Sequence, residues 1–174
     1  MRLRNSMWGF VVPIFALIIA ILIPALLKTR MIAGRVVCEH NLNGLSIAML
    51  MYVGRYDGKY PLPNQWCDFI LREPGSFTEK AFHCPLDSEG SFSYAMNKTI
   101  FEIEPGQTPA KLVMFFEANL GRNGIGGMEE VVLRHDKDGQ PGCNVSFVDG
   151  HVEFVTKDRI AGLMWTTEKN KGSQ

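Results

Sequence analysis

The pattern of apolar and polar residues divides the chain into an anchor and a soluble part. Residues 8–27 contain no charged side chain and show no polar face. As a helix these twenty residues would span about 30 Å, the thickness of the hydrocarbon core of a bilayer. The run predicts a transmembrane anchor over residues 1–27 that contacts the lipid bilayer through residues 8–27. A cleaved signal peptide is the alternative, although Ile-Pro-Ala at 23–25 is a poor cleavage site.

The residues after the anchor keep a helical period but become amphipathic. Five side chains recur at intervals of four, three, four and three: Cys38, Leu42, Leu45, Met49 and Tyr52. This spacing places them on one stripe of an α-helix. We therefore expect residues 28–53 to form an amphipathic helix at the start of a soluble domain over residues 28–165. A frayed tail is expected at 166–174.

Alternation with a period of two, which is typical of β-strands, begins after residue 91. Strands are predicted over residues 92–97, 111–117 and 131–135, and the second is apolar enough to be central. The other elements expected are two short helices and a glycine-rich loop: residues 64–71, residues 158–165 and residues 121–127.

The strongest local signal is a β-hairpin over residues 144–155. Two alternating runs flank an Asp-Gly pair at 149–150, which is preferred in two-residue type I′ turns. Pairing Val148 with His151 aligns one wholly apolar face: Val145, Phe147, Val152 and Phe154. The pattern as a whole predicts an α+β protein, in which a long N-terminal helix packs on an antiparallel sheet of four or five strands.

Composition adds little to this division. The 174 residues include 18 basic and 18 acidic side chains, and no acidic residue precedes Glu39. A neutral balance argues against a protein that binds nucleic acid by neutralising phosphates, so we expect no nucleic-acid partner. Basic residues flank the anchor on both sides, so charge does not decide its orientation.

Four cysteines are scattered through the soluble part, without a Cys-x-x-Cys pair. They are Cys38, Cys67, Cys84 and Cys143. Together with His83, His135 and His151 they lack the paired-ligand spacing of a zinc site, and nothing resembles a local Cys–His active-site signature. An even number of cysteines behind an anchor instead suggests disulfides outside the cytoplasm. No cofactor and no catalytic residue is predicted.

Several segments, in the right order, resemble pseudopilin-like proteins. They are CEHNLNGL from residue 38, YDGKYP from 56, FHCPLD from 82, SYAMN from 93, RH at 134–135 and NVSFVDGHV from 144. The chain resembles the type II secretion protein G-like group, and its last part resembles that group's prepilin-type H-x9-DG domain. The residues that carry the latter motif are His135, Asn144, Asp149 and Gly150.

This resemblance covers nearly the whole chain and implies a type IV pilin-like fold. It implies a non-enzymatic structural or accessory subunit of a type II secretion or type IV pilus-like system, with other pseudopilins or secretion-system proteins as partners. It also implies a single pass through the cytoplasmic membrane, with the C-terminal domain in the periplasm or extracytoplasmic space. The alternative is a stand-alone anchored binding module that has lost pilus-type assembly.

The resemblance suggests two further features. Cys38 and Cys84 fall in family-like segments, which implies the disulfides Cys38–Cys84 and Cys67–Cys143. Protein G-like pseudopilins bind calcium in a C-terminal loop, where this chain has Asp136 and Asp138 before a glycine. Carboxylates two apart can present oxygens to one Ca²⁺, although this sequence is also that of an ordinary polar turn.

The chain departs from the family pattern in two places, and the second departure leads to a prediction. Thirteen residues, not nine, separate His135 from Asp149. The prepilin signal has a glutamate at the fifth position after the cleaved glycine, and here Ile14 holds that position after Gly9 and Phe10. We therefore expect prepilin peptidase not to cleave the chain, and we expect a minor subunit or a lone anchor.

Overall fold

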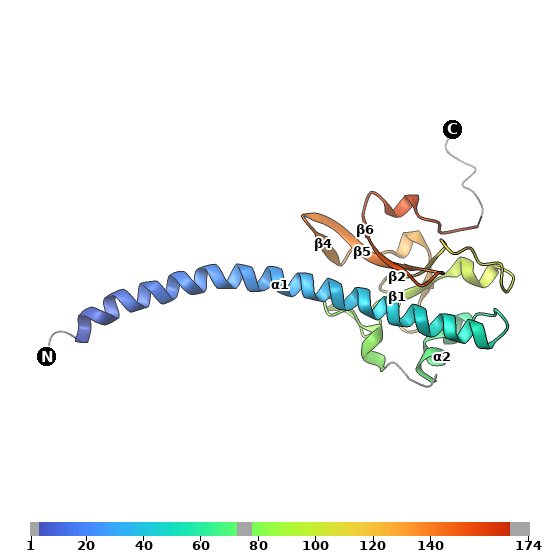
Figure 1. The fold of residues 1–174 in the computed structure, drawn as a ribbon, viewed down its shortest axis with the longest axis horizontal. Helices are drawn as coiled ribbons and strands as arrows, with labels where there is room; N and C mark the ends of the chain where they lie inside the picture. Colours follow the sequence, from blue (N-terminus) through green and yellow to red (C-terminus); the bar gives the residue numbers. More distant parts are fainter. Residues whose placement is uncertain (1–3, 73–77, 168–174) are drawn as a thin grey trace.

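The computed structural model describes residues 4–72 and 78–167, with the backbone alone for residues 4–10. Helix α1 (Arg4–Arg55) is continuous, and its N-terminal half extends away from a compact head like a stick (Figure 1). All the side chains of residues 11–33 are exposed. Among the described residues, α1 is the one helix long and apolar enough to cross a membrane. Its length and composition agree with the predicted anchor.

The second half of α1 packs on the head along the predicted stripe. Cys38, Leu42, Leu45 and Met49 are fully buried, and Tyr52 is nearly so. Packing begins at Gly34, where a Cβ atom would lie 2.7 Å from Cγ of Leu86. The glycine therefore lets a loop approach the helix closely at the neck, where the exposed stick meets the head. The predicted amphipathic helix is confirmed.

The head contains one mixed sheet. Within the described residues six strands form it, in the order β3-β1-β2-β5-β4, with β6 also paired to β5. They are β1 (Tyr94–Asn97), β2 (Val113–Glu117), β3 (Ile125–Gly126), β4 (His135–Lys137), β5 (Gln140–Phe147) and β6 (Val152–Thr156). The short strand β3 runs parallel to β1 and the other pairs are antiparallel. The fold is α+β with a pilin-like layout, as predicted.

Details of the predicted elements need correction. The sheet has six strands and one parallel pair, because two residues of the glycine-rich loop at 121–127 pair with β1. Residues 131–134 form no strand, and β4 begins only at His135. The closing helix expected at 158–165 is reduced to one 3₁₀ turn, η5 (Ile160–Gly162).

The helical elements around the sheet are short. Helix α2 (Trp66–Arg72) follows the 3₁₀ turn η1 (Pro63–Gln65). It buries Trp66 and Ile70, whereas Phe69 is half-buried. The remaining 3₁₀ turns are η2 (Glu79–Phe82), η3 (Lys98–Glu102) and η4 (Met128–Glu130). Of the tail predicted at 166–174, residues 168–174 lie outside the described part of the chain.

The β5–β6 hairpin has a different register from the predicted one. The N–H of Phe147 donates to the carbonyl of His151 at 3.0 Å, so the loop has three residues. Gly150 takes the left-handed conformation that such a loop requires, with a φ of +90°. Val145 consequently pairs with Glu153, and Phe154 lies on the opposite face. The two-residue Asp-Gly turn lies instead between β4 and β5, where Lys137 pairs with Gln140.

The sheet carries a hydrophobic core on each face. One core lies between α1, α2 and the sheet and contains Trp66, Cys67 and Phe115. The other contains Cys143 and Val145 and is closed by Trp165, which contacts Phe116 edge-on. The sheet between them separates Cys67 from Cys143.

Candidate functional site

A buried cluster of polar side chains lies at the neck, between α1 and the sheet. Cys38 comes from α1, Cys84 from the loop before β1, Glu117 from the end of β2 and His135 from the start of β4. Cys38, Cys84 and Glu117 are 0% exposed and His135 is 3% exposed. Four segments that are distant in sequence therefore bring two thiols, one imidazole and one carboxylate together out of contact with solvent.

The four side chains contact one another directly. Oε1 of Glu117 lies 2.7 Å from Sγ of Cys38 and 2.9 Å from Nε2 of His135. Nε2 of His135 in turn lies 3.5 Å from Sγ of Cys84. One ligand atom each from Cys38, Cys84 and His135 lies within 4.8 Å of the others. These distances place the two sulfurs and the imidazole nitrogen close to one another, with the Glu117 carboxylate in contact with Cys38 and His135.

Local structure explains why each group lies there. Cys38 occupies the buried stripe of α1, and Glu117 ends an apolar strand that is covered on both faces. The backbone N–H of Asn144 on β5 donates to Oε1 of Glu117 at 3.1 Å. The hydroxyl of Tyr94 on β1 donates to Sγ of Cys38 at 3.2 Å. The surrounding sheet thus orients both the carboxylate and the thiol.

A buried ion pair holds the loop that carries Cys84. Nη2 of Arg134 lies 2.9 Å from Oδ2 of Asp87, and the two side chains are 5% and 3% exposed. The hydroxyl of Ser93 donates to the same Asp87 oxygen at 2.7 Å and accepts from the N–H of Cys84 at 2.9 Å. Since Arg134 precedes His135, this network connects the cysteine loop to the segment that carries the histidine.

The environment shifts the protonation of the cluster. Burial raises the pKa of the Cys38 thiol well above its usual value. A hydrogen bond from Cys38, with help from His135, outweighs burial and lowers the pKa of Cys84 to about 4. Burial alone would lower the pKa of His135, but contacts with Cys84 and Glu117 raise it to about 9. Cys84 therefore favours the thiolate form beside a protonated imidazole.

Among the described residues five buried side-chain polar atoms have no hydrogen-bond partner, and three of them belong to the cluster and its neighbour Asn144: Oε2 of Glu117, Nδ1 of His135 and Oδ1 of Asn144. Buried polar atoms in folded proteins are nearly always paired, so each unpaired one calls for an explanation. Three in one place indicate that the protein groups alone do not satisfy the cluster.

Two kinds of chemistry match this group of side chains. A Cys–His pair is the arrangement of a nucleophile and its base. A nucleophile, however, must be reached by its substrate, and both groups are buried. Two sulfurs, one imidazole nitrogen and one carboxylate oxygen are also the ligand types that zinc prefers. A closed site of this kind matches metal binding better than catalysis.

The structure contains neither of the predicted disulfides. All four cysteines are free thiols. Cys38 and Cys84 are brought together, but by hydrogen bonding within the cluster. Cys67 and Cys143 lie on opposite faces of the sheet, so the predicted Cys67–Cys143 bond is wrong. Cys67 accepts from the N–H of Asn123 at 3.3 Å, and burial raises its pKa to about 12.

The remaining predicted residues fall into three places. His135 and Asn144 of the family motif belong to the buried cluster, whereas Asp149 and Gly150 form the tip of the β5–β6 hairpin. Asp149 there pairs with the ring of His151. Asp136 and Asp138 lie on the β4–β5 turn, where Oδ1 of Asp136 accepts from the N–H of Gly139 at 2.8 Å. Calcium binding by this pair stays a prediction.

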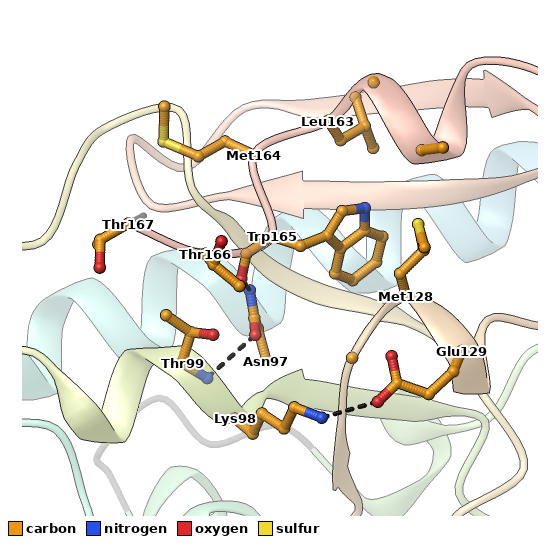
Figure 2. Close-up of a pocket in the computed structure, with 13 residues that line it drawn as sticks. Asn97, Lys98, Thr99, Met128, Glu129, Leu163, Met164, Trp165, Thr166 and Thr167 are labelled. Carbon is orange, nitrogen blue, oxygen red and sulfur yellow. Dashed lines mark hydrogen bonds and ion pairs between the residues drawn. The ribbon is translucent and has the colours of Figure 1, made fainter. Parts of the chain in front are cut away.

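A surface hollow of about 520 Å³ lies beside the end of β1, and none of the four cluster residues lines it (Figure 2). The two charged side chains that line it, Lys98 and Glu129, pair with each other at 2.7 Å. Asn97 uses its side chain to hold the backbone of Thr99 and Trp165. The polar groups drawn there maintain the fold, so we take the buried cluster as the candidate site.

Sequence reasoning missed Glu117 and missed the convergence of the cysteines with His135. One signal was available for Glu117, because a carboxylate that ends the apolar run KLVMFFE on a central strand must be buried and needs a partner. No spacing in the sequence links Cys38, Cys84 and His135. Searches against protein-family models, curated proteins and solved structures return no match for the chain.

Proposed function

We propose that the chain is a membrane-anchored, pseudopilin-like structural or accessory subunit of a type II secretion or type IV pilus-like system, without catalytic activity. The proposal rests on the continuity of α1. One helix is exposed and apolar over residues 11–27 and becomes the buried layer of an α+β head from Gly34 onward. Because α1 is continuous, it holds the soluble domain rigidly relative to the membrane or protein that surrounds residues 11–27.

The exposed half of α1 requires apolar surroundings. The side chains of Phe15, Leu17, Ile21 and Leu26 are each more than 60% exposed. A contiguous apolar surface of this kind marks a region that contacts a membrane or another protein. A lipid bilayer satisfies it on all faces, and the corresponding helices of neighbouring subunits would pack on it within the membrane.

We place the head outside the cytoplasmic membrane, on the strength of the family resemblance alone. The basic residues that flank the apolar run are balanced, and the cysteines, which are free thiols, no longer indicate an oxidising compartment. A reporter that is active only in the periplasm, fused after Gln174, should be active. An expressed but inactive fusion would reject this orientation.

Assembly is tested by purification of the full chain, tagged at its C-terminus, from its native membrane in mild detergent. We expect other pseudopilins or inner-membrane secretion components to co-purify. The matched control is the same chain with Ala16 and Ala20, which lie four apart on the outer half of α1, both replaced by Leu. Small residues permit close helix–helix contact, so this variant should lose the partners while keeping its membrane location.

The alternative is a lone anchored binding module, and one observation favours it. Ile14 occupies the position at which type IV pilin-like proteins have a membrane-buried glutamate for a neighbouring subunit. Cross-linking through an Ala16→Cys substitution distinguishes an assembled subunit from a lone module. Cross-links to other subunits support assembly, and a chain that stays monomeric in its native membrane supports the lone module.

A further inference from the structure

We infer that Cys38, Cys84, Glu117 and His135 together bind one zinc ion, which joins α1 to the sheet at the neck of the molecule. This inference goes beyond the proposed function and does not depend on it, because it rests on the buried cluster alone.

The chemical nature of the donors selects the metal. Zinc in proteins binds cysteine sulfur, histidine nitrogen and carboxylate oxygen, with four ligands arranged as a tetrahedron. Thiolates favour zinc over the hard ions magnesium and calcium, which take oxygen ligands. The cluster supplies four such donors, each from a different segment of the chain. With all four positions taken by protein there is none for a reacting water, so the site is structural.

The distances between donors fit a small common centre. The Oε1–Sγ distance of 2.7 Å between Glu117 and Cys38 is shorter than sulfur's radius normally allows for a hydrogen bond. Nε2 of His135 lies 2.9 Å from Oε1 of Glu117 and 3.5 Å from Sγ of Cys84. In a tetrahedral site with donors at about 2.0–2.3 Å from the ion, neighbouring donors lie roughly 3.3–3.8 Å apart. Metal binding would require them to move apart slightly, not to come together.

The charges of the cluster also call for a cation. Glu117, Cys38 and Cys84 are each negatively charged when they act as metal ligands, and the imidazole of His135 is then neutral. The neighbouring guanidinium of Arg134 is already paired with Asp87 at 2.9 Å. A buried carboxylate next to thiols is costly without a compensating charge. A divalent ion supplies that charge, and its binding would release to solvent the protons that its ligands hold.

The unpartnered atoms are an independent observation. Glu117 is 0% exposed, and Oε2 has no hydrogen-bond partner although Oε1 lies among three donors. The groups that contact Glu117 therefore satisfy one oxygen of the carboxylate and leave the other without a partner. A catalytic or purely structural pair of thiol and histidine would leave that oxygen unexplained.

A Cys38–Cys84 disulfide is the competing use of the same thiols. The two uses exclude each other, because sulfur atoms bonded to each other cannot bind zinc as thiolates. A disulfide would also leave Glu117 and His135 buried without the sulfur contacts that they now make. Zinc accounts for all four residues, whereas the disulfide accounts for two.

The first experiment uses the full chain, purified in detergent without a metal-affinity step. We expect about one zinc ion per chain by elemental analysis. Replacement with Co²⁺ should produce the near-ultraviolet thiolate-to-cobalt absorption and the intense visible bands of a tetrahedral site. A wild-type chain with less than a tenth of an ion and no thiolate-to-cobalt band after Co²⁺ addition overturns the inference. Peptides joined by a Cys38–Cys84 disulfide, found after thiol alkylation, also overturn it.

Variants then test the ligand set. Cys84→Ser and His135→Asn should each lower bound zinc to less than a tenth of an ion. Glu117→Gln, which keeps the shape of the side chain, should weaken Co²⁺ binding roughly tenfold or more. Cys67→Ser is the matched control, because Cys67 is equally buried but lies outside the cluster. Full zinc content in Cys84→Ser would contradict the assignment. If the variants fail to fold by circular dichroism, the wild-type cobalt spectrum still decides.

Discussion

Oε1 of Glu117 lies 2.7 Å from Sγ of Cys38, although the two residues are 79 positions apart in the chain. This contact joins the sheet to α1 close to the point at which the helix leaves the head. Farther along α1 the layers are held by apolar packing. Helix α1 is therefore attached to the sheet by a polar contact and by apolar packing. Separate substitutions can test each of these.

The apolar part is tested by shortening one side chain on the buried stripe. Leu45 is 0% exposed, and Leu45→Ala should lower the free energy of unfolding of the head by about 2–5 kcal/mol through lost burial and a cavity. Ile47 lies on the same helix and is 49% exposed. Ile47→Ala is therefore the control, and it should change the free energy of unfolding far less. Denaturant unfolding in detergent measures both. Equal effects would show that α1 does not pack as described.

The polar network beside the cluster is tested at Asp87. Asp87→Ala leaves the guanidinium of Arg134 buried without its counter-charge, and this should cost about 3–5 kcal/mol. The exposed pair of Glu153 and Arg159 is the comparison, and Glu153→Ala should cost no more than about 1 kcal/mol. A small effect at Asp87 would mean that the pair is hydrated in solution.

The sequence was sufficient to predict an element when its apolar pattern is compatible with only one buried face. The stripe from Cys38 to Tyr52 can bury only one side of a helix, and all five members are buried. The hairpin was different, because β6 reads Val-Glu-Phe-Val from residue 152 and has apolar residues at both parities. A shift of one residue replaces Val152 and Phe154 by Glu153 and Val155 on the face of Val145, so an apolar residue lies on that face in either register.

The candidate site was beyond such reasoning for a related reason. Its four residues lie on four segments, and three of these are brought together only by the pairing of β1, β2, β4 and β5 around α1. Zinc sites that sequences reveal have closely spaced ligand pairs, and this one has none. The buried charge of Glu117 was visible, but its partners depend on tertiary structure.

Alanine substitutions at three glycines test the conformations of the β4–β5 turn and the β5–β6 loop. Gly139 and Gly150 have φ values of +82° and +90°, so an alanine at either position should cost about 1–2 kcal/mol from backbone strain. A Cβ at Gly150 would also lie 3.1 Å from Cδ1 of Leu50 on α1. Gly162 has no atom within 4 Å of its Cβ position, and Gly162→Ala should be nearly neutral. Thermal unfolding that ranks Gly162→Ala as the most harmful would reject these loop conformations.

Acid sensitivity is expected at Asp68. A hydrogen bond from Arg122, followed by one from Asn123, lowers the pKa of this carboxyl group in the folded state. The stability that it contributes is therefore complete above its unfolded pKa of about 3.9 and is lost as the pH falls through the lower folded value. Asp68→Asn should cost about 1 kcal/mol or less at pH 7, because the pair is partly exposed.

The sign of this linkage gives a clear measurement. The difference in unfolding free energy between wild type and Asp68→Asn should shrink as the pH is lowered below about 4. It should also shrink in high salt, which screens the pair. A difference that grows at low pH would show that the carboxyl group is not held by Arg122.

The N-terminus is expected to remain uncleaved in the native membrane. Prepilin peptidase recognises a glycine followed by an acidic fifth residue, and Ile14 holds that position after Gly9 and Phe10. Pro13 lies inside α1 just before it and stiffens the segment that the enzyme would engage. Intact-mass analysis of the native protein should find residues 1–9 present, and a methylated chain that starts at Phe10 would contradict this. As a control, Ile14→Glu restores the missing acid and should make cleavage by the peptidase detectable. An intramembrane carboxylate is costly without a partner, so this variant should also depend on neighbouring subunits as the wild type does not.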